Sequence, residues 1–153
     1  MESVEYAVAA ERAGADRIEL CSDLLCGGVT PDATLMQAVG ERVRIPIHVL
    51  IRLRSGDFCY SEREFEIMKR DIAAAKKIGL SGVVLGVLDP SSRIDQERTR
   101  ALVQLAHPLP ATFHRAFDQC ADLNAALEAT VTAGAKRILT SGGAALPSTD
   151  SST

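Results

Sequence analysis

Two places in the sequence combine side chains that could bind a ligand or take part in a reaction. Cys21 follows the predicted strand RIEL, and its thiolate is a soft ligand of the kind that selects Cu(I). His114, Arg115 and Asp118 stand close together at the end of another predicted strand, and such a titratable group is typical of a functional site. The alternative for Cys21 is structural, because a cysteine behind an apolar run is as often a small buried side chain.

A polar loop over residues 54–60 adds charged side chains. Arg52 and Arg54 stand at its start, and Asp57 lies within it. Two guanidinium groups could hold a phosphate or a carboxylate, but the same residues would suit a loop closed by salt bridges. The Ser-Gly-Gly sequence at 141–143 resembles an anion-cradling turn, which is a weak indication from three small residues.

The four cysteines are not spaced for zinc binding or for a disulfide framework. None forms a C-x-x-C pair, and the amino-terminal segment does not resemble a secretion signal. Reduced thiols in a cytoplasmic protein are therefore expected. Cys59 lies between two aromatic residues and suits packing as well as ligation, and His48 inside an apolar run is expected to be structural.

Composition and charge exclude several classes of partner. The chain has 153 residues, of which 46% are hydrophobic and 24% charged, as in an ordinary globular domain. Its net charge is -3 and it has no basic run, so a nucleic-acid partner is not expected. No apolar stretch approaches the roughly 20 residues of a membrane span, so a membrane partner is not expected either.

Short apolar runs alternate with segments of helical spacing along the chain. An S-x-x-E capping box at Ser61 and Glu64 opens one helix and Gly79 ends it, while Thr30 is predicted to cap another. The predicted strands are residues 17–20, 46–52, 83–88, 111–115 and 137–140. Helix-strand alternation of this length predicts a parallel sheet, either in a closed eight-stranded barrel or in an open doubly wound sheet. The absence of a G-x-G-x-x-G motif disfavours the second.

In both architectures ligands bind where the strands end, so polar residues at those positions are the first candidates. Glu19, Arg52, His114 and Arg115 all fall near predicted strand ends. A charged group enclosed at the strand ends needs interaction partners, so these four side chains are expected to form a network around a ligand.

The length is short for a barrel. Eight units typically need about 250 residues, and only five strands are visible. Residues 1–143 are therefore expected to form a partial barrel domain. Residues 144–153 are small, polar and without periodicity, so they are expected to be a disordered tail.

Five blocks of sequence resemble the CutC copper-homeostasis family in their order and spacing. They are GADRIELC at 14–21, GG with TP at 27–31, IRLRSGDFCYS at 51–61, TFHRAFD at 112–118 and RILTSG at 137–142. The resemblance implies a TIM-type (β/α)8 barrel, a cytoplasmic or also nuclear location, and a role in copper tolerance or trafficking through Cu(I) binding. It does not imply a reaction.

The chain also departs from the family pattern. Relatives begin with another strand that ends in a cysteine, and they end with two further strands, so the strands here are expected to be the second to sixth. Cys21 therefore lacks the thiol that would pair with it around Cu(I), and Cys59 or His114 would have to supply the second ligand. Open sheet edges are expected to favour aggregation or a homo-oligomer.

Three hypotheses follow from these observations. The first is a Cu(I)-binding protein that uses Cys21. The second is an enzyme in which Glu19 and His114 act as acid and base. Its proposed contacts to a small anionic substrate are Arg52, Arg54, Asp57, Arg115 and Asp118. The third is a fragment that has lost its function.

Overall fold

Five parallel strands form one sheet in the order in which they occur along the chain. The computed structural model describes residues 3–22 and 28–139. The strands are β1 (Ile18–Leu20), β2 (Ile47–Leu50), β3 (Gly82–Leu85), β4 (Ala111–Phe113) and β5 (Arg137–Ile138). A doubly wound sheet would reverse its strand order at one point, whereas a barrel of βα units keeps sequence order. The arrangement is therefore an arc of a TIM-type barrel, as predicted.

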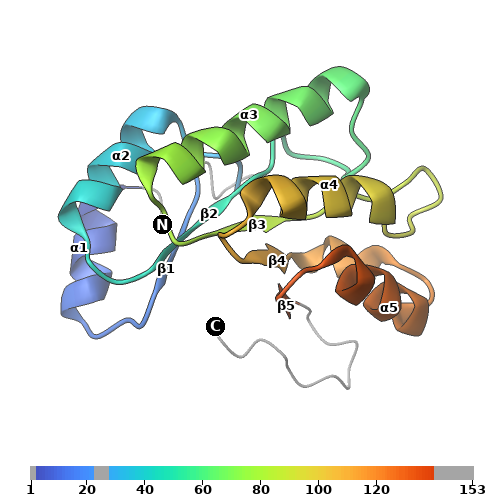
Figure 1. Ribbon diagram of the computed structural model, residues 1–153. Helices are drawn as coiled ribbons and strands as arrows, with labels where there is room; N and C mark the ends of the chain where they lie inside the picture. The colour runs from blue at the N-terminus through green and yellow to red at the C-terminus, as the bar shows by residue number, and fades with distance from the viewer. Residues whose placement is uncertain (1–2, 23–27, 140–153) are drawn as a thin grey trace.

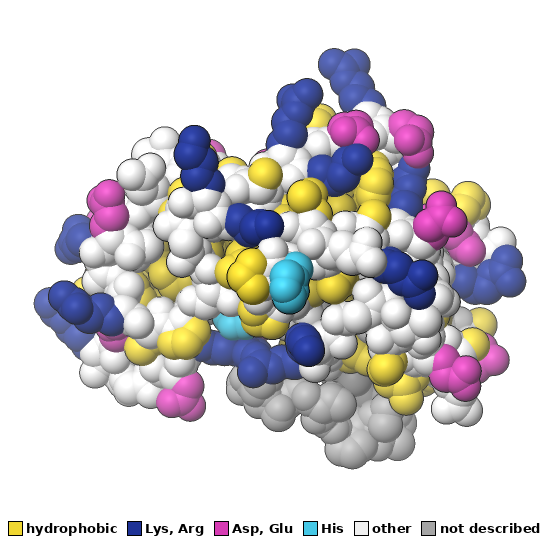
Figure 2. Space-filling model, in the orientation of Figure 1, with side chains coloured by type: hydrophobic (Ala, Val, Ile, Leu, Met, Phe, Trp, Pro, Cys, Tyr) yellow, Lys and Arg dark blue, Asp and Glu magenta, His cyan; other side chains and the backbone are white. Residues whose placement is uncertain are grey.

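The helices follow one another along one side of the sheet (Figure 1). They are α1 (Val4–Arg12), α2 (Ala33–Arg42), α3 (Glu62–Ile78), α4 (Gln96–Ala106) and α5 (Leu123–Ala133). Figure 2 shows that charged side chains of both signs project from this helix-covered face at separate places, with hydrophobic side chains between them. In the described part of the chain, no helix is long and apolar enough to cross a membrane.

The core lies between the sheet and the helices. Alternate strand residues point to this core, as the two-residue period of a strand requires. They are Ile18, Leu20, Ile47, Val49, Ile51, Val83, Leu85, Val87, Ala111 and Phe113. The residues between them occupy the other face, and they include Glu19, Cys21, His48 and Arg52. The chemistry-bearing side chains are thus placed on the face that a barrel encloses.

The capping residues predicted from the sequence lie at the helix ends, except at the start of α2. Ser61 and Glu64 form the predicted capping box, and Gly79 has the left-handed conformation, with φ of 92°. The prediction that Thr30 caps α2 was wrong, because Asp32 Oδ1 accepts the hydrogen bond from Leu35 N at 2.8 Å. The Thr30 hydroxyl instead accepts from Arg52 N at 2.7 Å, so it holds the end of β2.

Glu11 joins α1 to the segment that leads into β2. Its carboxylate accepts hydrogen bonds from Arg44 N at 2.7 Å and Ile45 N at 3.1 Å. Replacing Glu11 by alanine is expected to lower the free energy of unfolding by about 1–2 kcal/mol, since two backbone donors lose a charged acceptor. Urea unfolding measures this. The control is Glu41→Ala on the exposed face of α2, which should change stability by less than about 0.5 kcal/mol.

Candidate functional site

The imidazole of His114 is the most enclosed polar group at the carboxyl ends of the strands. It directly follows β4 and is only 7% exposed. One side of the ring lies against the backbone of Gly86, where an added Cβ would come within 2.4 Å of Cε1. The Phe58 ring lies near it as well, with 4.9 Å between centroids. The ring is therefore held between the end of β3 and the loop that follows β2.

The hydrogen bonding of His114 fixes where its proton lies. Nδ1 accepts a hydrogen bond from Ala116 N at 3.1 Å, so it cannot itself carry a proton. In the neutral ring the proton is then on Nε2, which is buried and has no hydrogen-bond partner among the described residues. Burial and the charge of Arg52 lower the pKa of His114 to about 3. At neutral pH this side chain is a donor and a poor base.

Arg52 follows β2 and packs against the same Phe58 ring as His114. Its guanidinium donates to Gly28 O at 3.3 Å and to Gly56 O at 3.0 Å, and it stacks over the Phe58 ring at 4.9 Å. These contacts tie together the loops that follow β1 and β2. The structure thus brings two of the predicted residues, Arg52 and His114, to the same Phe58 ring, each 4.9 Å from its centroid.

Arg54 and Asp57 stabilise the loop in which they lie. The Arg54 guanidinium pairs with Glu64 at 2.7 Å and with Asp57 at 3.1 Å, and it also donates to Cys59 O at 3.1 Å. The pairing raises the pKa of Arg54 and lowers that of Glu64 to about 2. These residues therefore form a loop closed by salt bridges, which was the alternative to anion binding. The salt bridge to Glu64 holds the loop at the start of α3.

The remaining predicted residues lie elsewhere on the arc. On β1, the Glu19 side chain is 44% exposed, 3.9 Å from Arg17, and Cys21 is buried just after the strand. Arg115 is exposed and Asp118 half-buried on a 3-10 helix, η2 (Arg115–Gln119), which the sequence did not predict. Residues 141–143 and Cys26 lie outside the described residues.

The predicted metal ligands do not form a cluster. Cys21 follows β1 and His114 follows β4, with β2 and β3 between them, about 14 Å apart along the sheet. Cys59 is half-buried in the loop after β2, and its backbone N–H donates to Asp57 Oδ1. Across residues 3–22 and 28–139, no group of three or more His, Cys, Asp or Glu side chains could hold a metal ion.

Sequence reasoning missed the glycines that make room for the histidines. Gly82 and Gly86 are four residues apart and so share one face of β3. The His48 ring fills the space over Gly82, 2.5 Å from where a Cβ would lie, just as His114 fills the space over Gly86. Two glycines four apart in an apolar run were the available signal.

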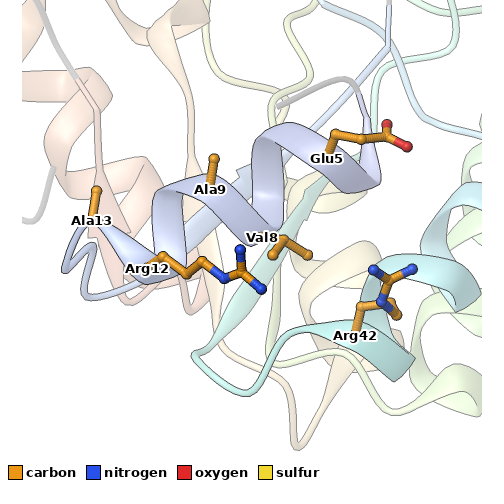
Figure 3. Close-up of a pocket in the computed structure, with 6 residues that line it drawn as sticks. All are labelled: Glu5, Val8, Ala9, Arg12, Ala13 and Arg42. Atoms are coloured by element: carbon orange, nitrogen blue, oxygen red, sulfur yellow. The ribbon is translucent and has the colours of Figure 1, made fainter.

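A cleft of about 600 Å³ lies away from these residues, between α1 and α2 (Figure 3). It is lined by Glu5, Val8, Ala9, Arg12, Ala13 and Arg42. Arg12 and Arg42 belong to the last turns of their helices, which lead into the amino ends of β1 and β2. Because Glu5 lies in the first turn of α1, the cleft runs along the length of this helix, in the helix layer and not at the strand ends where barrels bind ligands.

Known proteins similar to the chain agree on one family. Copper homeostasis protein cutC homologs from Mus musculus and Homo sapiens are 55% and 54% identical over 142 residues. Each match covers 93% of this chain but 52% of the relative. A family protein CutC from Erwinia tasmaniensis is 50% identical over 91% of this chain and 55% of its own length. The chain thus spans about half the length of the curated relatives it matches.

Solved structures give the same fold. A crystal structure of a CutC protein from Streptococcus agalactiae superposes with a TM-score of 0.84 at 32% identity, covering 94% of this chain and 72% of that one. A phosphoenolpyruvate phosphomutase from Streptomyces platensis superposes with a TM-score of 0.63 at 18% identity, over 90% of this chain and 56% of that one, which shows the fold alone. The model of the CutC family matches residues 1–152, and the chain therefore belongs to the CutC family.

Proposed function

We propose that the chain acts in copper homeostasis by binding Cu(I) through the thiolate of Cys21. The names of the relatives support the copper role. The observation that carries the choice of residue is the position of Cys21, buried at the carboxyl end of β1 on the face away from the helices. Its Sγ lies 3.4 Å from where a Cβ on Gly28 would be, so residue 28 is a direct neighbour of the sulfur.

A second ligand would make the Cu(I) site two-coordinate, and Cys59 and His114 are the proposed candidates. Cys59 is the better suited of the two, since a thiolate is soft and its side chain is half-exposed. His114 is less suited because its Nδ1 lone pair accepts the Ala116 N–H and its Nε2 carries the proton. Either one would have to approach Cys21 across the sheet.

The Cu(I) site predicts a specific effect of one substitution. The reduced chain, titrated with Cu(I) against a competing chelator, is expected to bind one ion, and Cys21→Ser is expected to weaken binding by about tenfold or more. Cys120→Ser is the control, because Cys120 is an equally buried thiol beside η2, and its pKa is raised by burial. Equal losses in both variants, or no binding by the folded chain, would contradict the proposal.

The proposal extends to location and assembly. A cytoplasmic location would keep these thiols reduced. A homo-oligomer would form through the outermost described strands, β1 and β5, by pairing with strands of a second copy.

A second candidate function is catalysis on a small anionic metabolite. The observation in its favour is that the half-buried cation of Arg52 packs on the same Phe58 ring as His114, whose ring N–H has no partner among the described residues. In this proposal Glu19 is the acid or base, and the exposed Arg115 and nearby Asp118 contact the substrate. A thermal-shift screen of small carboxylates and phosphates, repeated on Arg115→Ala, tests it.

A further inference from the structure

The face of β3 that points away from the helices carries two matched pairs of glycine and histidine. His48 of β2 is the register partner of Gly82 at the start of β3. At the other end, Leu85 pairs with Phe113, which places Gly86 beside His114. In each pair the imidazole occupies the space of the missing Cβ, at 2.5 Å over Gly82 and 2.4 Å over Gly86.

The two histidines differ in what surrounds them. His48 lies at the amino end of β3, where conserved side chains of barrels serve stability, while His114 lies at the carboxyl end, where ligands bind. Among the described residues, only His114 has a ring nitrogen that accepts from a backbone donor, Ala116 N, and only His114 packs against Phe58 and feels the charge of Arg52.

Burying an N–H group without an acceptor costs about 1–3 kcal/mol of stability, so His114 Nε2 is expected to have a hydrogen-bond partner in the functional state. That partner must be an acceptor, because the nitrogen carries the proton and offers no lone pair. It is also expected to be negatively charged, because the Arg52 guanidinium stacks on the same Phe58 ring that His114 contacts, and its positive charge acts on His114. A metal ion or an ammonium group would satisfy neither condition.

We propose that the Nε2–H of His114 donates a hydrogen bond to an oxygen of a small bound anion, a carboxylate or a phosphate, held beside the Arg52 guanidinium. The inference rests on the second candidate function and gives His114 a different part in it. His114 binds and orients the anion as a neutral donor, while proton transfer, if any occurs, falls to another group such as Glu19. Gly86 is a positioning residue, since any side chain there would displace the ring.

The test uses the full chain labelled with 15N at its histidines. Inorganic phosphate and acetate are added separately at neutral pH, and sodium chloride of matched ionic strength is the control. A saturable change in the Nε2–H signal of His114 is expected with at least one anion and not with chloride. The signals of His48 should not move, because His48 lies at the other end of β3.

Two variants separate binding from packing. His114→Phe keeps an aromatic ring without the N–H and is expected to weaken binding of the effective anion by about tenfold, measured by thermal shift. His48→Phe makes the same change over Gly82 and should leave the affinity unchanged. The titration of the unsubstituted chain decides the question should either variant fail to fold.

The outcomes distinguish this inference from the function on which it rests. If an anion stabilises the chain without moving the His114 signal, the anion binds elsewhere; the second candidate then survives and this inference is overturned. Equal movement of both histidine signals, or an Nε2–H that responds to neither anion because it is bonded to a structural water only, also overturns it. If phosphate moves the His114 signal and acetate does not, the ligand is a phosphate, and the reverse indicates a carboxylate.

Discussion

Gly86→Ala is expected to destabilise the fold by about 3 kcal/mol, near the upper end of what overpacking of a core costs. The new methyl group would lie 2.4 Å from Cε1, 2.7 Å from Nδ1 and 2.9 Å from Nε2 of His114. The ring cannot easily move away, because Phe58 lies beside it and Ala116 N is bonded to it. Urea unfolding with a constant m-value measures the loss.

Gly40→Ala on α2 is the matched control. There the nearest atom to an added Cβ is 3.6 Å away, which is ordinary van der Waals contact. Replacing a helical glycine by alanine is expected to stabilise the fold by up to about 1 kcal/mol. The double variant Gly86→Ala, His114→Ala sharpens the experiment. Once the ring is gone, the substitution at Gly86 should add little to the effect of His114→Ala. A Gly86→Ala chain as stable as the parent would contradict the packing described.

Acidification is expected to destabilise the chain already above pH 5. His114 has an ordinary pKa of 6.5 when unfolded and about 3 when folded, so below pH 6.5 the unfolded chain binds a proton that the folded chain does not. Its contribution is complete above pH 6.5 and is lost as the pH falls toward 3. Between pH 7.5 and 5 the free energy of unfolding should fall by about 2 kcal/mol on account of this one group.

Other groups can be separated from this effect. Burial also lowers the pKa of His48, which acts in the same direction, whereas Glu64, with a pKa near 2 in the folded chain, contributes only below its ordinary value of 4.5. The measurement is therefore the difference in pH dependence between the chain and His114→Gln, with the exposed His107→Gln as control. The same pH dependence in the chain and in His114→Gln would show that the imidazole is not buried as described.

Features that depend on neighbouring residues could be predicted from the sequence. The capping box of Ser61 and Glu64 and the helix stops at Gly79 and Gly134 need only a few adjacent residues, and all are present. The parallel order of the strands followed from the alternation of elements. Thr30 was assigned wrongly because its hydroxyl bonds to Arg52, 22 residues away, which no local pattern reveals.

The candidate site could be predicted only in part. Strand-end position grouped Arg52 with His114, since the ends of parallel strands gather at one rim, and both side chains contact Phe58 there. The burial and the protonation of the His114 ring could not be predicted. They depend on Gly86, which follows β3, and on the turn of η2 that presents Ala116 N. Likewise, whether Arg54 faces a ligand or its own loop depends on Glu64, which its spacing alone does not decide.

The strictly sequential order of β1 to β5 has a consequence for how the chain folds. Each strand pairs with the next one along the chain, some 30 residues later, and no pairing within the described residues joins distant parts of the sequence. Such an arrangement can begin to form at any adjacent pair and spread outward, as in repeat proteins. During synthesis, each unit would find its docking surface already complete when it leaves the ribosome, so the order of translation and the order of assembly coincide.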